Sequence, residues 1–258
     1  MGKVLFEKDG HLGRITINRS DQLNCFDYET LVLLGEIVES LQADKEVRAV
    51  IITGAGEKAF SAGADLKERR TLSEKEVRRN VRAIREVFTA IEELPQPTIA
   101  AINGYALGGG LELALACDFR YAVSGAVMGL TEVSWAIIPG AGGTQRLSRL
   151  VGTSRAKELI LTARKIDAEK ALDIGLVNEV YGQKDLIEGA TSLAQEIMGN
   201  GPLAVTQAKY AINHGSNVDI HTGLAIEAKA YEVIIPTEDR IEALEAFKEK
   251  RPANFKGK

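Results

Sequence analysis

The sequence predicts an α/β fold, and two observations carry the prediction. Up to about residue 150, short apolar runs alternate with stretches whose apolar residues recur every three to four positions, as in amphipathic helices. Glycine-rich loops follow three of the apolar runs, near residues 61–65, 104–110 and 137–144. The 258 residues are 45% hydrophobic and 26% charged, which is typical of a globular protein with a large core.

The first elements are a hairpin, a helix and a buried strand. Residues 3–18 alternate around a turn at Asp9-Gly10. Asp27 then caps a helix with an apolar stripe, and residues 48–53 form a strand buried on both faces. The next loop loosely matches a dinucleotide-binding fingerprint. Because residues 60–65 do not continue as a periodic helix, the sequence disfavours a nicotinamide or flavin site.

The middle of the chain continues the alternation. Ser73 and Glu76 form a capping box for a helix that Pro95 ends. Strands are predicted at 98–102 and 119–123. Helices are predicted from about Gly110 and over 145–151.

The chain is mainly helical from Ser154 onward. Asp167 caps a short helix that Gly175 stops, and a last strand is predicted at 176–180. Further apolar stripes lie within 186–197, 204–212, 224–235 and 241–247. We divide the chain into a core, 1–199, and a helical region, 200–258, which we expect to pack on a partner subunit or on the core.

Composition excludes several classes. The net charge of −4 gives no overall argument for nucleic acid or an acidic membrane. Cys25 and Cys117 provide neither a disulfide framework nor a zinc-ligand spacing, and no metal site is expected. The N-terminus lacks a signal-like apolar segment, and no apolar run is long enough to cross a bilayer. We therefore expect a cytoplasmic protein.

The stretch from Asn103 to Glu112 is the strongest candidate for chemistry. Glycines 108–110 would let backbone N–H groups approach a ligand, and the start of the following helix favours negative charge. Glu112 lies in the first turn of that apolar helix. Two interpretations remain open from these residues alone: a carboxylate that only complements the helix dipole, or a site that stabilises a carbonyl oxygen as it becomes negative.

Several motifs in one order carry a resemblance to a known family. They are Ala59–Lys67, Asn103–Leu113, Glu132, Ile138–Leu147 and Ala246–Arg251. Together they resemble the crotonase (enoyl-CoA hydratase/isomerase) superfamily over essentially the whole chain. The resemblance implies a crotonase-like spiral of ββα units with a helical C-terminal trimerisation region, assembled as a homotrimer or a hexamer made of two trimers.

The resemblance also implies an activity. It would be an enoyl-CoA hydratase, a lyase that adds water syn across the 2,3 double bond of a 2-enoyl-CoA in fatty-acid or branched-chain amino-acid breakdown. The N–H groups of Ala64 and Gly109 would hold the enolate-like thioester oxygen. Glu112 would deprotonate the attacking water, Glu132 would supply the Cα proton, and the Gly140 backbone would help to place the water.

The remaining implied contacts are with coenzyme A, which is part of the substrate, because no permanently bound cofactor is expected. They fall on an adenine-binding strip and on two C-terminal positions: Ala62, Ala64, Asp65, Leu66, Lys67, Tyr231 and Lys250. Two positions depart from the family pattern, Ser20 in place of a proline and Cys25 in place of alanine, and neither touches the proposed chemistry. Trp135 and Met128 could lie near the acyl pocket, although core packing is favoured for each.

Alternatives remain open. The protein could be an enoyl-CoA isomerase, or a methylglutaconyl-CoA hydratase, a branch that the chain especially resembles and in which some members are described as RNA binders. Residues 67–86 carry eight basic against four acidic side chains. Because the basic helix at 73–94 lacks the interleaved aromatic residues that stack bases, the sequence disfavours RNA binding. The preferred acyl chain cannot be read from these motifs.

Overall fold

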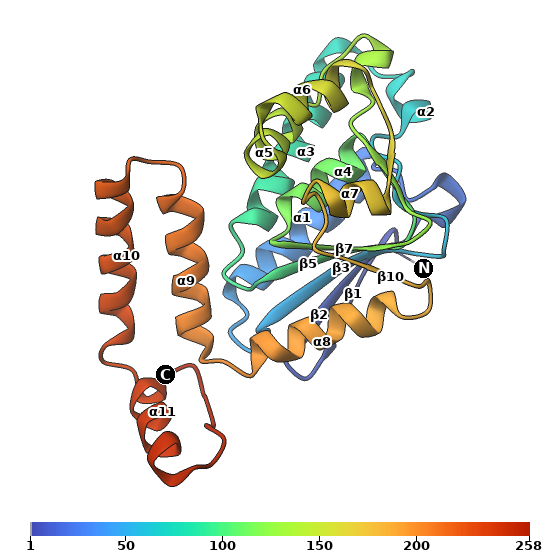
Figure 1. The fold of residues 1–258 in the computed structure, drawn as a ribbon. Coiled ribbons are helices and arrows are strands. Elements are labelled where there is room, and N and C mark those ends of the chain that lie inside the picture. The colour runs from blue at the N-terminus through green and yellow to red at the C-terminus, as the bar shows by residue number, and fades with distance from the viewer. Residues whose placement is uncertain (1) are drawn as a thin grey trace.

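The computed structural model describes residues 2–258 and confirms the predicted α/β fold (Figure 1). Six strands form the main sheet in the order β1-β2-β3-β5-β7-β10. They are β1 (Val4–Asp9), β2 (Leu12–Ile17), β3 (Ala49–Gly54), β5 (Thr98–Ile102), β7 (Phe119–Val123) and β10 (Glu179–Tyr181). β1 and β2 form the predicted antiparallel hairpin, and all other neighbours are parallel. Every residue of β3 and β5 is buried, which explains their continuous apolar runs.

A second sheet of four short strands was not predicted. It consists of β4 (Ala59–Ser61), β6 (Tyr105–Leu107), β8 (Val127–Gly129) and β9 (Ile166–Asp167). β3, β5 and β7 of the main sheet are followed in the chain by β4, β6 and β8 of the second sheet, and then by helices. The chain therefore repeats a strand-strand-helix unit, as the resemblance implied.

The last strand begins later than predicted. The sequence placed it at 176–180, whereas β10 covers Glu179–Tyr181. Leu176 and Val177 are buried, but their N–H groups donate to the Ala171 carbonyl. They close the end of helix α7 (Ala168–Asp173) instead of pairing with β7.

Helices cover both faces of the main sheet. α1 (Tyr28–Ala43) and α4 (Gly109–Ala116) lie on one face with α3 (Glu74–Glu92) packed against them, and α8 (Leu186–Met198) covers the other face (Figure 1). Asp27 caps α1 by accepting a hydrogen bond from Thr30 N, and Ser73 and Glu76 form the predicted capping box of α3. All residues of α4 are buried, so its start is held between the sheets and the surrounding helices.

The remaining helices of the core are shorter. They are the 3-10 turns η1 (Ser20–Gln22) and η2 (Glu132–Trp135), and the helices α2 (Leu66–Arg69), α5 (Gly143–Val151) and α6 (Thr153–Leu161). The sequence placed the start of α5 at residue 145, two residues too late. α2 was not predicted, because a single turn is too short for a helical period.

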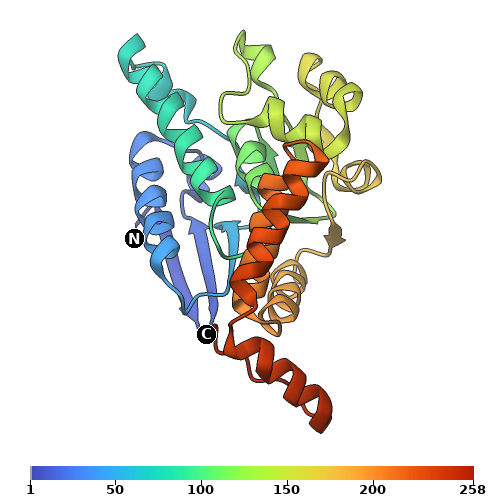
Figure 2. The same cartoon turned by 90° about the vertical axis from the view of Figure 1, so that its left-hand side faces the viewer.

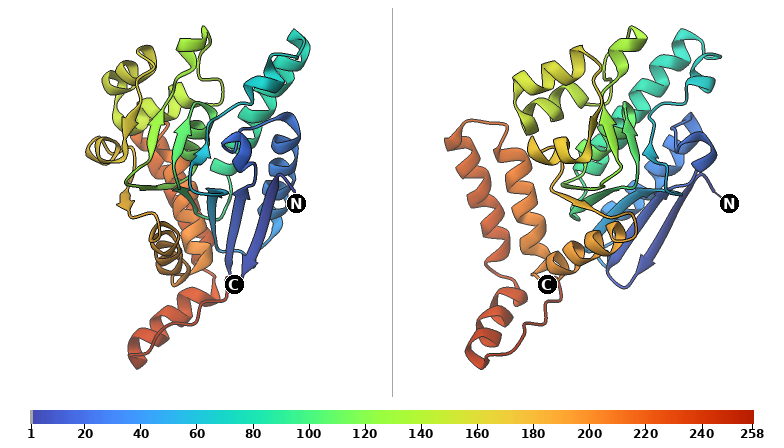
Figure 3. Two further views of the ribbon diagram at one scale, coloured as in Figure 1. Left: turned by 90° about the vertical axis from the view of Figure 1, so that its right-hand side faces the viewer. Right: turned by 45° about the vertical axis from the view of Figure 1, so that its right-hand side comes forward.

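The last three helices extend away from the sheets. α9 (Pro202–Gly215) and α10 (Ile220–Ile234) form an antiparallel pair beside the core, and α11 (Glu238–Glu249) continues beyond it (Figures 2 and 3). Lys209 on α9 forms an ion pair of 2.7 Å with Asp118, directly before β7 of the main sheet. Large apolar side chains on α10 and α11 are exposed, including Phe247, which is 86% exposed. The domain boundary at 199/200 and the oligomeric state stay predictions.

Candidate active site

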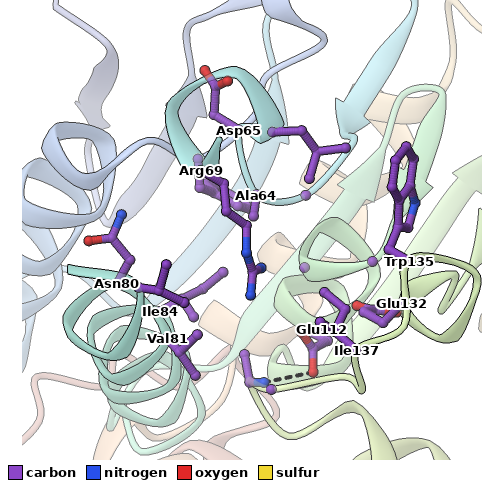
Figure 4. Close-up of a pocket in the computed structure, with 18 of the residues that line it drawn as sticks. Ala64, Asp65, Arg69, Asn80, Val81, Ile84, Glu112, Glu132, Trp135 and Ile137 are labelled. Carbon is purple, nitrogen blue, oxygen red and sulfur yellow. Dashed lines mark hydrogen bonds between the residues drawn. The ribbon is translucent and has the colours of Figure 1, made fainter. Parts of the chain in front are cut away.

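One pocket of about 580 Å³ lies between α2, α3, the start of α4 and residues 131–141. Its size suits a small molecule. Most of its lining is apolar: Leu66, Leu72, Val77, Val81, Ile84, Ile137 and Ile138. Charged or polar side chains from several elements also line it: Asp65, Glu68, Arg69, Asn80, Glu112, Thr131 and Glu132. Figure 4 shows Arg69, Glu112 and Glu132 among them.

Two backbone N–H groups at one edge of the pocket are available to a ligand. Residues 63–65 pair with Phe26 as in a short parallel bridge: Phe26 N donates to Gly63 O, and Asp65 N donates to Phe26 O. Ala64 lies between Gly63 and Asp65 in the chain, so its N–H points away from Phe26. Gly109 is the first residue of α4 and has no acceptor inside the helix. Within residues 2–258, neither N–H has a protein acceptor. Such groups can stabilise a developing oxyanion.

The two loops that carry these N–H groups are in direct contact. A Cβ atom on Gly109 would lie 3.7 Å from Ala64 N. Gly63 has a φ of +90°, and a Cβ there would lie 2.8 Å from Leu107 O and 2.9 Å from Gly109 N. Because only glycine accepts both this φ and this contact, Gly63 keeps the loops together.

Glu112 is held by the third glycine-rich loop. The side chain is buried, and its Oε1 accepts hydrogen bonds of 2.8 Å from both Ala141 N and Gly143 N. A Cβ on Gly143 would come within 2.9 Å of the same oxygen, so glycine permits the approach. Burial raises the pKa of Glu112, and the two N–H groups oppose that rise.

The Glu112 loop is itself fixed to α3. The Arg146 guanidinium donates to Ala141 O at 2.8 Å and to both carboxylate oxygens of Glu92, at 3.1 and 2.6 Å. The sequence analysis assigned the Gly140 backbone to placing the attacking water. Gly140 lines the pocket, so that role stays a prediction, and the N–H groups that hold Glu112 belong to Ala141 and Gly143. The glycine-rich pattern marked this loop without revealing which residues point inward.

Glu132 starts η2 at the same end of the pocket (Figure 4). The residue is buried, and within residues 2–258 its Oε2 has no hydrogen-bond partner. Burial, together with repulsion from Glu112, raises the pKa of Glu132 to about 7, and the charge of Arg69 opposes the rise. The carboxyl group is therefore about half protonated near neutral pH. Its Oε1 lies 3.1 Å from the position of a Cβ on Gly108, beside the oxyanion loop.

The predicted coenzyme A residues divide into two groups. Ala62, Ala64, Asp65 and Leu66 line the pocket. The Asp65 carboxylate, however, caps α2 through Lys67 N and pairs with Arg19 at 2.9 Å, so its contacts are structural.

The other predicted coenzyme A residues do not reach the pocket of this single chain. Lys67 is exposed beside it, Tyr231 is 65% exposed on α10, and Lys250 follows α11. None of the three is part of the pocket lining formed by residues 2–258. Their binding roles stay predictions.

Two further features were missed or misread. Core packing was favoured for Trp135 over a place near the acyl pocket, but Trp135 is 63% exposed and lines the pocket, whereas Met128 is buried in the core as favoured. Arg69 was noted only as part of a basic stretch. It lies on the unpredicted helix α2, so no signal in the sequence placed its side chain in the pocket.

The basic helix α3 has internal partners for several of its cations. Arg78 pairs with Glu74 and Arg82 pairs with Glu86, each one helical turn apart. Arg79 lies over the Tyr28 ring, 3.7 Å from its centre. This pattern is typical of a solvated helix surface and does not favour the RNA hypothesis.

Two other kinds of feature are absent from residues 2–258. No helix there has the length and apolar character required to cross a membrane. No cluster of three or more His, Cys, Asp or Glu side chains in that range could hold a metal ion.

Comparisons with known proteins agree with the fold and identify the family. The sequence profile of the family described as Enoyl-CoA hydratase/isomerase matches residues 7–258. The chain is 47% identical to the short-chain-enoyl-CoA hydratase of Clostridium acetobutylicum, covering 97% of this chain and 96% of that protein. It is 51% identical to the mitochondrial methylglutaconyl-CoA hydratase of Homo sapiens, covering 93% and 72%. The crystal structure of an enoyl-CoA hydratase from Bacillus anthracis, 52% identical, superposes over both entire chains with a TM-score of 0.98.

Proposed function

Because the chain belongs to the enoyl-CoA hydratase/isomerase family, we propose that it is an enoyl-CoA hydratase that adds water syn across the 2,3 double bond of a 2-enoyl-CoA thioester. One observation carries the proposal. Glu112 and Glu132 meet in one pocket beside the available N–H groups of Ala64 and Gly109. Hydration of an unsaturated thioester requires both pairs of groups.

The two N–H groups would bind the thioester oxygen. When water adds to Cβ, the electrons of the double bond move towards the carbonyl, and its oxygen becomes negative. N–H groups that are already directed at this oxygen stabilise the enolate more than the substrate. Loss of one such donor typically lowers the rate on the order of 10²–10³-fold.

The two carboxyl groups would divide the proton transfers. Ionised Glu112 takes a proton from water as the water oxygen bonds to Cβ, and protonated Glu132 gives its proton to Cα. The product gains one H and one OH, and a proton then passes from Glu112 back to Glu132. The raised pKa of Glu132 suits the acid, and the N–H groups of Ala141 and Gly143 favour the ionised form of Glu112.

The coenzyme A contacts and the assembly are part of the same proposal. We expect backbone groups of Ala62, Ala64 and Leu66 to contact the ligand at the pocket entrance. Lys67, and Tyr231 and Lys250 of a neighbouring subunit, would reach its distal part. The exposed apolar side chains of α10 and α11 support assembly into a trimer or a hexamer. A cytoplasmic location stays a prediction, since the relatives named above include bacterial and mitochondrial proteins.

Loss of the crotonyl-CoA absorbance tests the proposal directly. Purified protein should consume crotonyl-CoA and form 3-hydroxybutyryl-CoA. Glu112→Gln and Glu132→Gln should each lower kcat by at least about 10²-fold, the usual contribution of a general acid or base. Glu188→Gln is the matched control, because Glu188 is exposed on α8, on the opposite side of the main sheet. Intact hydration by Glu112→Gln would refute the two-carboxylate mechanism.

An isomerase is the second candidate within the family. It moves a double bond by removing and returning protons and needs a single carboxylate, so the N–H contacts of Glu112 favour hydration. Conversion of a 3-enoyl-CoA to the 2-enoyl form without water addition would support the isomerase. RNA binding would be supported only by a steeply salt-dependent affinity for single-stranded RNA that is lost when Arg78, Arg79 and Arg82 are neutralised.

A further inference from the structure

The direction of the Ala64 N–H group depends on a very short pairing between two segments of the chain. Residues 23–26 meet residues 62–65 in a single parallel bridge that lies outside the named strands. The main-chain hydrogen bonds between them run from Ala62 N to Leu23 O at 3.0 Å, from Phe26 N to Gly63 O at 2.8 Å and from Asp65 N to Phe26 O at 2.9 Å. Because Gly63 is conformationally permissive and the pairing is short, these bonds alone resist rotation of the Ala64 peptide poorly.

Arg19 joins the two paired segments through its side chain, which is 10% exposed. Its Nη2 pairs with Asp65 Oδ2 at 2.9 Å and with Asp27 Oδ2 at 3.1 Å. Its Nη1 donates a hydrogen bond to Cys25 O. Asp65 directly follows Ala64 in the chain, and the other two partners belong to the opposite side of the pairing. The guanidinium therefore fixes both sides of the bridge at once.

The two carboxylates that Arg19 joins also cap helices. Asp27 caps α1 and Asp65 caps α2, each through its other oxygen. Burial alone would raise the pKa of Asp65, but the hydrogen bonds from Arg19 and from the N–H groups of α2 outweigh it and keep that pKa below its usual range. The carboxylate is therefore ionised near neutral pH, and charge-assisted hydrogen bonds of this kind are stronger than neutral ones.

We propose that Arg19 is a positioning residue for the oxyanion site, which keeps the Ala64 N–H directed at the thioester oxygen without touching the substrate. Arg19 is not part of the pocket lining formed by residues 2–258. A hydrogen bond weakens steeply as its donor turns away, and the enolate loses more from this than the uncharged thioester does. The inference rests on the proposed function, in which Ala64 N and Gly109 N hold that oxygen.

Steady-state hydration of crotonyl-CoA by Arg19→Met gives the first test. We expect kcat to fall roughly 10- to 100-fold, which is less than the loss of a whole donor causes. Gly109 N remains in place, and Glu68 still joins α2 to the start of α1 by accepting a hydrogen bond from Tyr28 N. KM should change by less than about threefold. Arg19→Lys should recover part of the rate, because it keeps the charge but not the planar fork.

Two further variants separate this role from general destabilisation. Lys209→Met is the matched control, because it removes an ion pair of similar burial, with Asp118, and neither residue lines the pocket of residues 2–258. It should leave kcat unchanged. Asp65→Asn weakens the link to Arg19 but keeps a good cap for α2. It should lower kcat, and combining it with Arg19→Met should lower kcat little further.

The carbonyl stretch of a bound thioester reports the hydrogen bonds to its oxygen directly. Butanoyl-CoA, isotope-labelled at the thioester carbonyl carbon, cannot be hydrated, and difference infrared spectra of the saturated complex isolate its band. Hydrogen bonds weaken the C=O bond and move the band to lower wavenumber. The unaltered protein and Lys209→Met should give the same low band. Arg19→Met should move the band back towards the position it has in an apolar solvent, where no donor is present.

Two results would overturn the role of Arg19. One is a band that Arg19→Met leaves where the unaltered protein has it. The other is a KM raised more than about tenfold with an unchanged kcat, which would assign Arg19 to coenzyme binding. If Arg19→Met does not fold, Asp65→Asn decides by the same two readouts. A band of the unaltered protein that matches the apolar solvent would refute the proposed oxyanion site itself, and the role of Arg19 with it.

Discussion

Raising the pH from 6 to 9 should remove most of the hydration activity, because Glu132 must carry a proton to act as the acid. Burial and repulsion from Glu112 raise its pKa to about 7. The protonated fraction then falls from about nine tenths at pH 6 to about one tenth at pH 8 and one hundredth at pH 9. We expect kcat/KM to fall about tenfold by pH 8 and about a hundredfold by pH 9.

Initial rates with crotonyl-CoA at constant ionic strength would measure this fall of kcat/KM at alkaline pH. The alkaline limb of kcat/KM reports the pKa of the essential acid in the free enzyme. Because Glu112 and Glu132 interact, the limb belongs to the pair. Arg69→Gln should move it to higher pH, since the Arg69 charge lowers the pKa of Glu132. Arg70→Gln should leave it in place. A kcat/KM that stays constant from pH 6 to 9, or a limb that Arg69→Gln moves to lower pH, would refute the reasoning.

Three further predictions concern stability and geometry. Gly63→Ala should lower kcat on the order of 10²-fold by separating the two N–H groups, because its Cβ would lie 2.8 Å from Leu107 O; steady-state kinetics would check this, and an unchanged kcat would contradict it. Glu132→Gln should stabilise the fold at pH 8 by up to about 3 kcal/mol. The pKa of Glu132 in the folded protein lies above its ordinary value of 4.5, so the stability that the protonated side chain contributes at low pH is lost as the pH rises through about 7. Denaturant unfolding should therefore show a higher free energy of unfolding for Glu132→Gln at pH 8 but not at pH 5. Lys209→Met should lower the free energy of unfolding by roughly 1–3 kcal/mol, because it removes the partly buried ion pair with Asp118, and the double change with Asp118→Asn should show coupling between the two sites.

Much of the fold could be predicted because its signals are local. The caps at Asp27 and Ser73 lie within three residues of the N–H groups they satisfy, and β3 and β5 are apolar throughout. The second sheet gave no such signal. β4, β6 and β8 have three residues each, so they are defined by pairing with one another and not by a period of their own.

The candidate site also combines residues with a local sequence signal and residues placed by long-range contacts. Gly109 and Glu112 could be identified because a strand, a glycine run and a helix follow one another in the chain. The contacts from Ala141 and Gly143 to Glu112 span about thirty residues and depend on how one loop folds against another helix. Arg69 could not be placed, because the direction of its side chain depends on where α2 packs.

Arg146 has a consequence for how ligands enter the pocket. Since it joins Ala141 O to Glu92 on α3, the wall that carries Glu112 is assembled during folding, before any ligand arrives. Little binding energy is then spent on ordering the acid-base groups. Acyl groups of different shape must be accommodated by the opposite wall, where α2 is a single turn. Changes in α2 could then alter which ligands bind, while the loop that holds Glu112 keeps the acid-base groups in place.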